Sequence, residues 1–203
     1  MPDMDVLLRR APVIPVLMID RIDDALPIAA ALVAGGLPVL EVTLRTPAAL
    51  EAIRLMRQIP GAIVGAGTVL NAAQLHGAQN AGASFIVSPG LTTPLARAAA
   101  AAEIDFLPGV ANAADIMAGL DLGLDHFKFF PAEAIGGLKA LQAYASVFRN
   151  VRFCPTGGIS LASAPGWLAE DAVLCVGGSW LVPPGPVDPA GIRSRAADAA
   201  ALI

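Results

Sequence analysis

Short apolar segments alternate with alanine- and leucine-rich segments along the chain, and this alternation limits the possible folds more than any other feature of the sequence. The apolar segments are rich in β-branched residues, end in glycine, proline or a polar residue, and begin roughly 20 to 26 residues apart. They predict eight strands, at residues 13–18, 39–43, 62–66, 84–87, 105–107, 126–129, 151–155 and 172–176. The segments between them have helical spacing and predict helices at residues 24–34, 47–58, 72–80, 93–102, 111–120 and 138–146, with a last helix at 190–202.

Strands that alternate with helices in this way form a parallel sheet, because each helix carries the chain back to the edge at which the next strand starts. Eight such units in 203 residues predict an α/β protein with a single (β/α)8 TIM barrel of eight parallel strands, as one domain spanning residues 1–203. An open doubly wound sheet would place a glycine-rich turn after its first strand. Here that strand is followed by Ile19, Asp20 and Arg21, so we expect the closed barrel.

The composition argues against several classes of protein. With 56% hydrophobic and 15% charged residues, the chain is not of the disordered type. Its longest uncharged apolar stretch, residues 25–40, contains two prolines and two glycines and is too short to cross a membrane. The first residues lack the layout of a signal peptide, and a net charge of −4 offers no basic surface for nucleic acid. A zinc site with nitrogen and sulfur ligands would need nearly all of the two cysteines and two histidines, which argues against such a site. The two cysteines are typical of free thiols in a cytoplasmic protein.

Lys128 is the strongest candidate for a nucleophile. The chain has eleven arginines but only two lysines, Lys128 and Lys139. Lys128 ends a predicted strand within a run of phenylalanines, and strand alternation places it on the same face as His126 and Phe130. Burial favours the neutral amine of a lysine, which can form a Schiff base with a carbonyl substrate. The alternative is a lysine that extends its charge into the water at the mouth of the barrel.

Glu41 is an acidic residue inside an otherwise apolar predicted strand. A carboxylate in such a place needs a charged partner or a raised pKa, and either state suits a group that moves protons. Arg45, shortly after the strand, can form an ion pair with Glu41 or hold the carboxylate of a substrate in its two-pronged guanidinium. These two interpretations of Arg45 are compatible.

Glycine pairs follow the last two predicted strands, within residues 156–158 and 177–179. Many barrels bind phosphate with the loops after these same two strands, where backbone N–H groups face the anion. Glycine permits the close approach, and Ser179 adds a hydroxyl. The alternative is that both pairs serve only as tight turns.

Six motifs resemble those of the 2-keto-3-deoxy-6-phosphogluconate (KDPG) aldolases, a family that also contains 4-hydroxy-2-oxoglutarate aldolases. The motifs are EVTLRT at 41–46, GAGTV at 65–69, SPG at 88–90, KFFPAE at 128–133, FCPTGGI at 153–159 and GGSWL at 177–181. The resemblance extends from about residue 12 to residue 183. It implies that Lys128 forms the Schiff base and that Glu41 is the general acid and base.

The resemblance also implies roles for further residues. Arg45 and Thr68 match residues that hold the pyruvate part of the substrate, and Thr156 matches one linked to stereochemical preference. The other substrate-binding matches are Pro89 and Phe130, and the phosphate-binding matches are Gly157, Gly158, Gly178 and Ser179. Some positions depart. Some relatives carry an arginine near the end of the first strand, where this chain has Met18, with Arg21 close by, and Ile135 and Ser163 stand where relatives often have polar residues.

The resemblance implies a class I aldolase that cleaves KDPG to pyruvate and glyceraldehyde 3-phosphate in the Entner–Doudoroff pathway. It further implies a cytoplasmic homotrimer that needs no metal and no cofactor. Substrates derived from galactonate, and 4-hydroxy-2-oxoglutarate itself, share this chemistry and stay open. Two other functions also stay open: a phosphosugar epimerase or isomerase that uses Glu41 as a base, and a phosphosugar sensor without catalysis.

Overall fold

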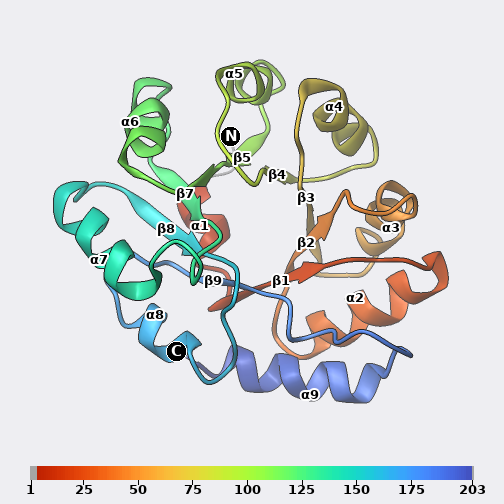
Figure 1. Ribbon diagram of the computed structural model, residues 1–203. Coiled ribbons are helices and arrows are strands. Elements are labelled where there is room, and N and C mark those ends of the chain that lie inside the picture. Colours follow the sequence, from red (N-terminus) through yellow and green to blue (C-terminus); the bar gives the residue numbers. More distant parts are fainter. Residues whose placement is uncertain (1–3, 203) are drawn as a thin grey trace.

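The computed structural model describes residues 4–202, in which strands and helices alternate from end to end (Figure 1). The strands are β1 (Val13–Leu17), β2 (Val39–Thr43), β3 (Ile63–Gly67), β4 (Phe85–Val87), β5 (Asp105–Leu107), β6 (Gly109–Val110), β7 (His126–Phe129), β8 (Arg152–Pro155) and β9 (Val176–Gly178). The helices are α1 (Met4–Leu8), α2 (Ala25–Ala34), α3 (Ala49–Met56), α4 (Ala72–Asn80), α5 (Thr93–Ala101), α6 (Ala113–Asp121), α7 (Gly137–Val147), α8 (Ala164–Leu168) and α9 (Pro189–Ala200), with a 3₁₀ turn η1 (Ile22–Asp24). Every predicted strand overlaps an observed one, whereas β6, α1 and α8 were not predicted.

The strands of residues 4–202 form two parallel sheets, one of six strands in the order β5-β4-β3-β2-β1-β9 and one of three in the order β6-β7-β8. The prediction of a single closed barrel of eight strands is therefore wrong: the structure is a six-stranded parallel half-barrel with a separate three-stranded sheet. Pro108, which has no N–H to donate, separates β5 from β6, and these two strands belong to different sheets. Between β8 and β9, the pairing in the described chain is reduced to isolated bridges at Phe153–Val173 and Thr156–Gly177.

Side-chain caps explain where several helices begin. Asn71, Thr92 and Asn112 precede α4, α5 and α6, and each side-chain oxygen accepts a hydrogen bond from the backbone N–H three residues further on. Such caps satisfy N–H groups that have no partner in the first turn of a helix. The caps therefore fix the starts of α4, α5 and α6, three of the helices that carry the chain back to the beginning of the next strand.

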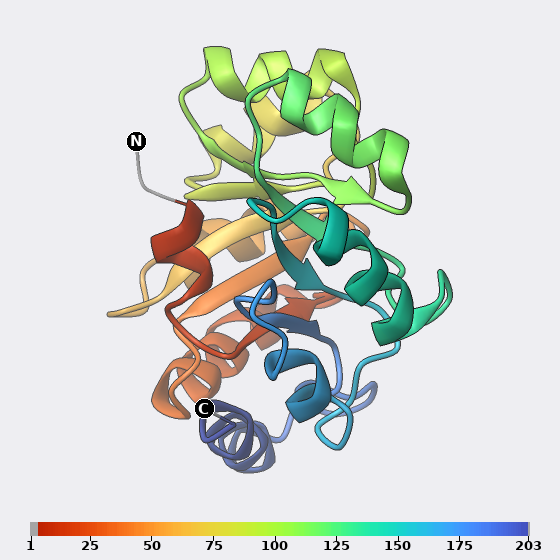
Figure 2. The same cartoon turned by 90° about the vertical axis from the view of Figure 1, so that its left-hand side faces the viewer.

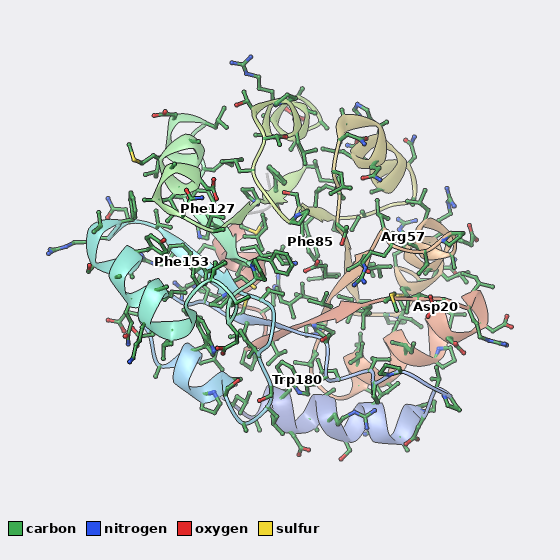
Figure 3. The ribbon with its side chains drawn as sticks, in the orientation of Figure 1. Asp20, Arg57, Phe85, Phe127, Phe153 and Trp180 are labelled. Carbon is green, nitrogen blue, oxygen red and sulfur yellow. The ribbon has the colours of Figure 1, made fainter. Side chains whose placement is uncertain are left out.

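Apolar side chains pack against both faces of the sheets. Phe127 and Phe153 belong to the larger cluster, which fills the space between the strands and the surrounding helices. Phe85 belongs to a smaller cluster on the opposite face and points toward the centre of the molecule (Figure 3). Leu7 and Leu8 of α1 complete this inner cluster at the end of the sheets where the strands begin (Figure 2).

Candidate active site

Lys128 and Glu41 form a buried ion pair between the two sheets. Lys128 is the third residue of β7 and Glu41 the third residue of β2, and Lys128 Nζ donates to Glu41 Oε1 at 2.9 Å and to Oε2 at 3.3 Å. Their side chains are only 6% and 4% exposed. Lys128 therefore does not extend into water, and Glu41 pairs with it and not with Arg45, which is exposed. The structure thus brings together the two residues that the sequence singled out separately.

One phenylalanine of the run lies beside the amine of Lys128, and two lie on the opposite face of the strand. The Phe130 ring lies with its centroid 5.4 Å from Lys128 Nζ, close enough for a cation–π contact. Phe127 and Phe129 point to the opposite face of β7 and are fully buried against the helices. His126, two residues before Lys128, lies at the start of β7. The alternation expected for this segment is therefore the observed one.

Arg45 and Ser179 lie beside a cavity of about 370 Å³ at the carboxyl ends of β1, β2 and β9. Met18, Arg21 and Thr43 also line it. The Thr43 hydroxyl donates to a backbone carbonyl of β1 at 2.8 Å, which ties β2 to β1 beneath the cavity. Arg45 has no ion-pair partner among residues 4–202, so its guanidinium is available to an anionic ligand.

Thr156 is buried directly after β8, and its environment shows why Gly177, one of the predicted glycine pair, carries no side chain. A Cβ atom added to Gly177 would lie 2.2 Å from Thr156 Oγ1, so the glycine leaves the space that this hydroxyl occupies. Gly178, the predicted phosphate-binding residue, is buried, and an added Cβ there would lie 2.1 Å from the Trp180 ring. A glycine inside a strand often marks a close approach, and this was the signal for Gly177 in the sequence.

The remaining predicted residues all lie in loops that follow strands. Gly157 and Gly158 have φ angles of 106° and 81°, in the left-handed region that glycine adopts without strain. They therefore form a tight turn after β8, which is compatible with a phosphate site. Thr68 follows β3 with a φ of 57°, and Pro89 is exposed after β4. The predicted residues are thus gathered at one end of the sheets.

Two free thiols, Cys154 and Cys175, are buried near the ion pair. A hydrogen bond with Cys154 and burial raise the pKa of the Cys175 thiol well above its usual value, and the negative charge of Glu41 adds to the rise. Burial of this kind disfavours the thiolate because the charge cannot be solvated. Cys175 therefore stays a neutral thiol and forms part of the apolar floor of the site.

The described residues contain no group of three or more His, Cys, Asp and Glu side chains that could hold a metal ion. Within residues 4–202, every helix is too short or too polar to cross a membrane.

The sequence matches several characterised aldolases. The KDPG and KHG aldolase family model matches residues 4–192. The chain is 65% identical over 202 residues to the 2-dehydro-3-deoxy-phosphogluconate aldolase of Zymomonas mobilis, covering 100% of this chain and 97% of that protein. It is 56% identical over 178 residues to the KHG/KDPG aldolase of Escherichia coli K12, covering 87% and 84% of the two chains.

Solved structures agree with these matches. The Z. mobilis KDPG aldolase with 3-phosphoglycerate superposes with a TM-score of 0.99 at 64% identity, covering 100% of this chain and 97% of that one. The Legionella pneumophila KDPG aldolase, with pyruvate captured as a covalent carbinolamine intermediate, has a TM-score of 0.95 at 44% identity, covering 98% of each chain. The chain therefore belongs to the KDPG and KHG aldolase family.

Proposed function

We propose that this protein is a class I aldolase that cleaves 2-keto-3-deoxy-6-phosphogluconate to pyruvate and glyceraldehyde 3-phosphate. The buried ion pair of Lys128 and Glu41 carries this proposal, because it places an amine and a proton acceptor within 2.9 Å of each other. An amine that is shielded from water and lies near the Phe130 ring suits the formation of a Schiff base. In the L. pneumophila relative, pyruvate is bound as a covalent carbinolamine, which is the adduct that precedes such a base.

The reaction begins when the neutral amine of Lys128 attacks the C2 carbonyl of the substrate. Glu41 Oε1 is placed to take a proton from Nζ and to return it to the carbinolamine hydroxyl, which leaves as water and gives a protonated imine. Glu41, again a carboxylate, removes the proton of the C4 hydroxyl, the bond between C3 and C4 breaks, and its electron pair passes to the imine to form an enamine. Glyceraldehyde 3-phosphate leaves, C3 of the enamine takes up the proton held by Glu41, and water hydrolyses the resulting imine to pyruvate and the free amine.

Other residues of the same end of the sheets hold the substrate in this proposal. The guanidinium of Arg45, beside the cavity, binds the carboxylate of the keto acid together with Thr68. The distal phosphate lies against the loops after β8 and β9. The residues proposed for these further contacts are Thr156, Pro89 and Phe130 for the sugar acid, and Gly157, Gly158, Gly178 and Ser179 for the phosphate.

We further propose a single domain that assembles as a homotrimer in the cytoplasm and acts in the Entner–Doudoroff pathway. Large apolar side chains such as Met117, Leu120 and Val147 are 58%, 42% and 71% exposed, and exposed apolar surface favours association. The buried free thiols Cys154 and Cys175 are typical of a reducing compartment.

Reduction with borohydride in the presence of pyruvate tests the chemistry directly. We expect one stable pyruvate adduct, located on Lys128 by peptide mass spectrometry. The Lys128→Arg variant keeps the positive charge but should give no adduct and no turnover, because a guanidinium does not act as the nucleophile. An adduct on another residue, or full activity in Lys128→Arg, would refute the proposal. Cleavage rates for the gluconate-derived, galactonate-derived and 4-hydroxy-2-oxoglutarate substrates will then rank the substrates.

A further inference from the structure

Gly65 and Gly67 of β3 face the interior, and the backbone does not require glycine at either position. Neither residue has a φ angle in the left-handed region, so other residues can adopt the same conformation. Glycine weakens the interior of a strand, because it loses more backbone freedom on folding and contributes no side chain to packing. A steric reason for each glycine is therefore expected.

For Gly67 that reason is the carboxylate of Glu41. A Cβ atom added to Gly67 would lie 2.2 Å from Glu41 Oε1, 2.7 Å from Cγ and 2.8 Å from Cδ. Oε1 is the same oxygen that accepts the 2.9 Å hydrogen bond from Lys128 Nζ. The carboxylate thus occupies the place of a side chain at Gly67 while it meets the amine.

The strand register shows how the carboxylate comes to lie there. Glu41 pairs with Gly65 on β3, and Thr43 pairs with Gly67. The Glu41 side chain therefore extends two residues toward the carboxyl end of β3, to the level at which Lys128 arrives from the other sheet. We propose that Gly67 is a positioning residue that keeps Glu41 Oε1 beside Lys128 Nζ, an inference that rests on the proposed aldolase function.

A methyl group at Gly67 displaces the carboxylate without destroying the fold. The atoms that it meets belong to the far half of a flexible side chain, which can rotate away. A shift of about 1 Å in a reacting group lowers a rate by about 100-fold. We therefore expect Gly67→Ala to lower kcat by about 100-fold, while KM changes little because Arg45 and Ser179 are not touched.

Two glycine variants serve as matched controls. Gly65→Ala adds the same methyl group to the same strand but meets the Phe85 ring at 2.4 Å, so it should lower thermal stability more than Gly67→Ala does. Gly77→Ala lies in α4, where the nearest atom is Leu50 Cδ1 at 3.7 Å. It should keep both the stability and the activity of the unmodified protein.

A double-mutant cycle with Glu41→Ala separates positioning from general damage. Alanine lacks Cγ, Cδ and the carboxylate oxygens, which are the atoms that an added Cβ at Gly67 would meet. Adding Gly67→Ala to Glu41→Ala should then change the remaining kcat by less than about threefold, although Gly67→Ala alone costs about 100-fold. Should Gly67→Ala alone not fold, the double variant must fold as well as Glu41→Ala does if the overlap with Glu41 is the cause, and a double variant less stable than Glu41→Ala would overturn the inference.

The outcomes distinguish this inference from the function on which it rests. If the unmodified protein gives no borohydride-trapped pyruvate on Lys128, the aldolase proposal fails and the inference fails with it. If the adduct forms, but Gly67→Ala keeps kcat within about threefold of the unmodified protein, only the inference fails. Losses that multiply in the double variant likewise overturn only the role of Gly67.

Discussion

Replacing Glu41 by glutamine should destabilise the protein by leaving the ammonium of Lys128 buried without its counter-charge. Breaking a buried ion pair on one side typically costs about 3–5 kcal/mol, against about 0–1 kcal/mol for an exposed pair. The 6% and 4% exposure of these side chains places the pair in the buried class. The Phe130 ring at 5.4 Å remains and offsets about 1 kcal/mol of this by a cation–π contact. A net loss of about 2–4 kcal/mol is therefore expected.

Thermal and urea unfolding near pH 7 measure this loss. For a chain of this length the expected loss corresponds to a lowering of Tm by about 4–16 °C. Lys128→Met removes the other charge, and Glu41→Gln with Lys128→Met removes both. The double variant should be nearly as stable as the unmodified protein, because no unpaired charge stays buried. An unchanged Tm in Glu41→Gln, or a double variant less stable than both single variants, would contradict the reasoning.

Two further predictions concern the thiols and the N-terminal helix. Burial and the raised pKa of Cys175 predict that neither Cys154 nor Cys175 reacts with a soluble disulfide reagent near pH 8 until the protein unfolds, and rapid modification of the native protein would contradict this. The hydrogen bond from Arg9 is the main cause that holds the pKa of Asp5 below its usual value, and burial opposes it. The charge of Arg9 and the contact with His126 also lower the pKa of Asp5. This stabilisation is present above the unfolded pKa of about 3.9 and is lost as the pH falls through the lower folded pKa, so Asp5→Asn should lower Tm near pH 7 but not near pH 2.

Much of the fold can be predicted from the sequence because strand and helix periodicities are local. The β-branched runs and the alanine-rich segments between them predict every major strand and the parallel direction. The five-residue helix α1 is too short to show a helical period, and β6 has only two residues. The sequence also does not predict the division into two sheets. That division depends on Pro108 and on the weak strand pairing beside Phe153, and strand pairing is decided only when strands distant in the sequence lie side by side.

Local sequence patterns identify the residues that can carry the chemistry: a rare lysine within a run of phenylalanines and an acid within an apolar strand. That these two residues meet follows only from the packing of the two sheets. Lys128 and Glu41 are 87 residues apart on strands of different sheets, and their contact depends on strand register and side-chain length. The same holds for Gly67, whose missing side chain matters only because the Glu41 carboxylate lies across it. Local patterns set which element a residue joins, whereas contacts across the interior arise from the packing of elements that are distant in sequence.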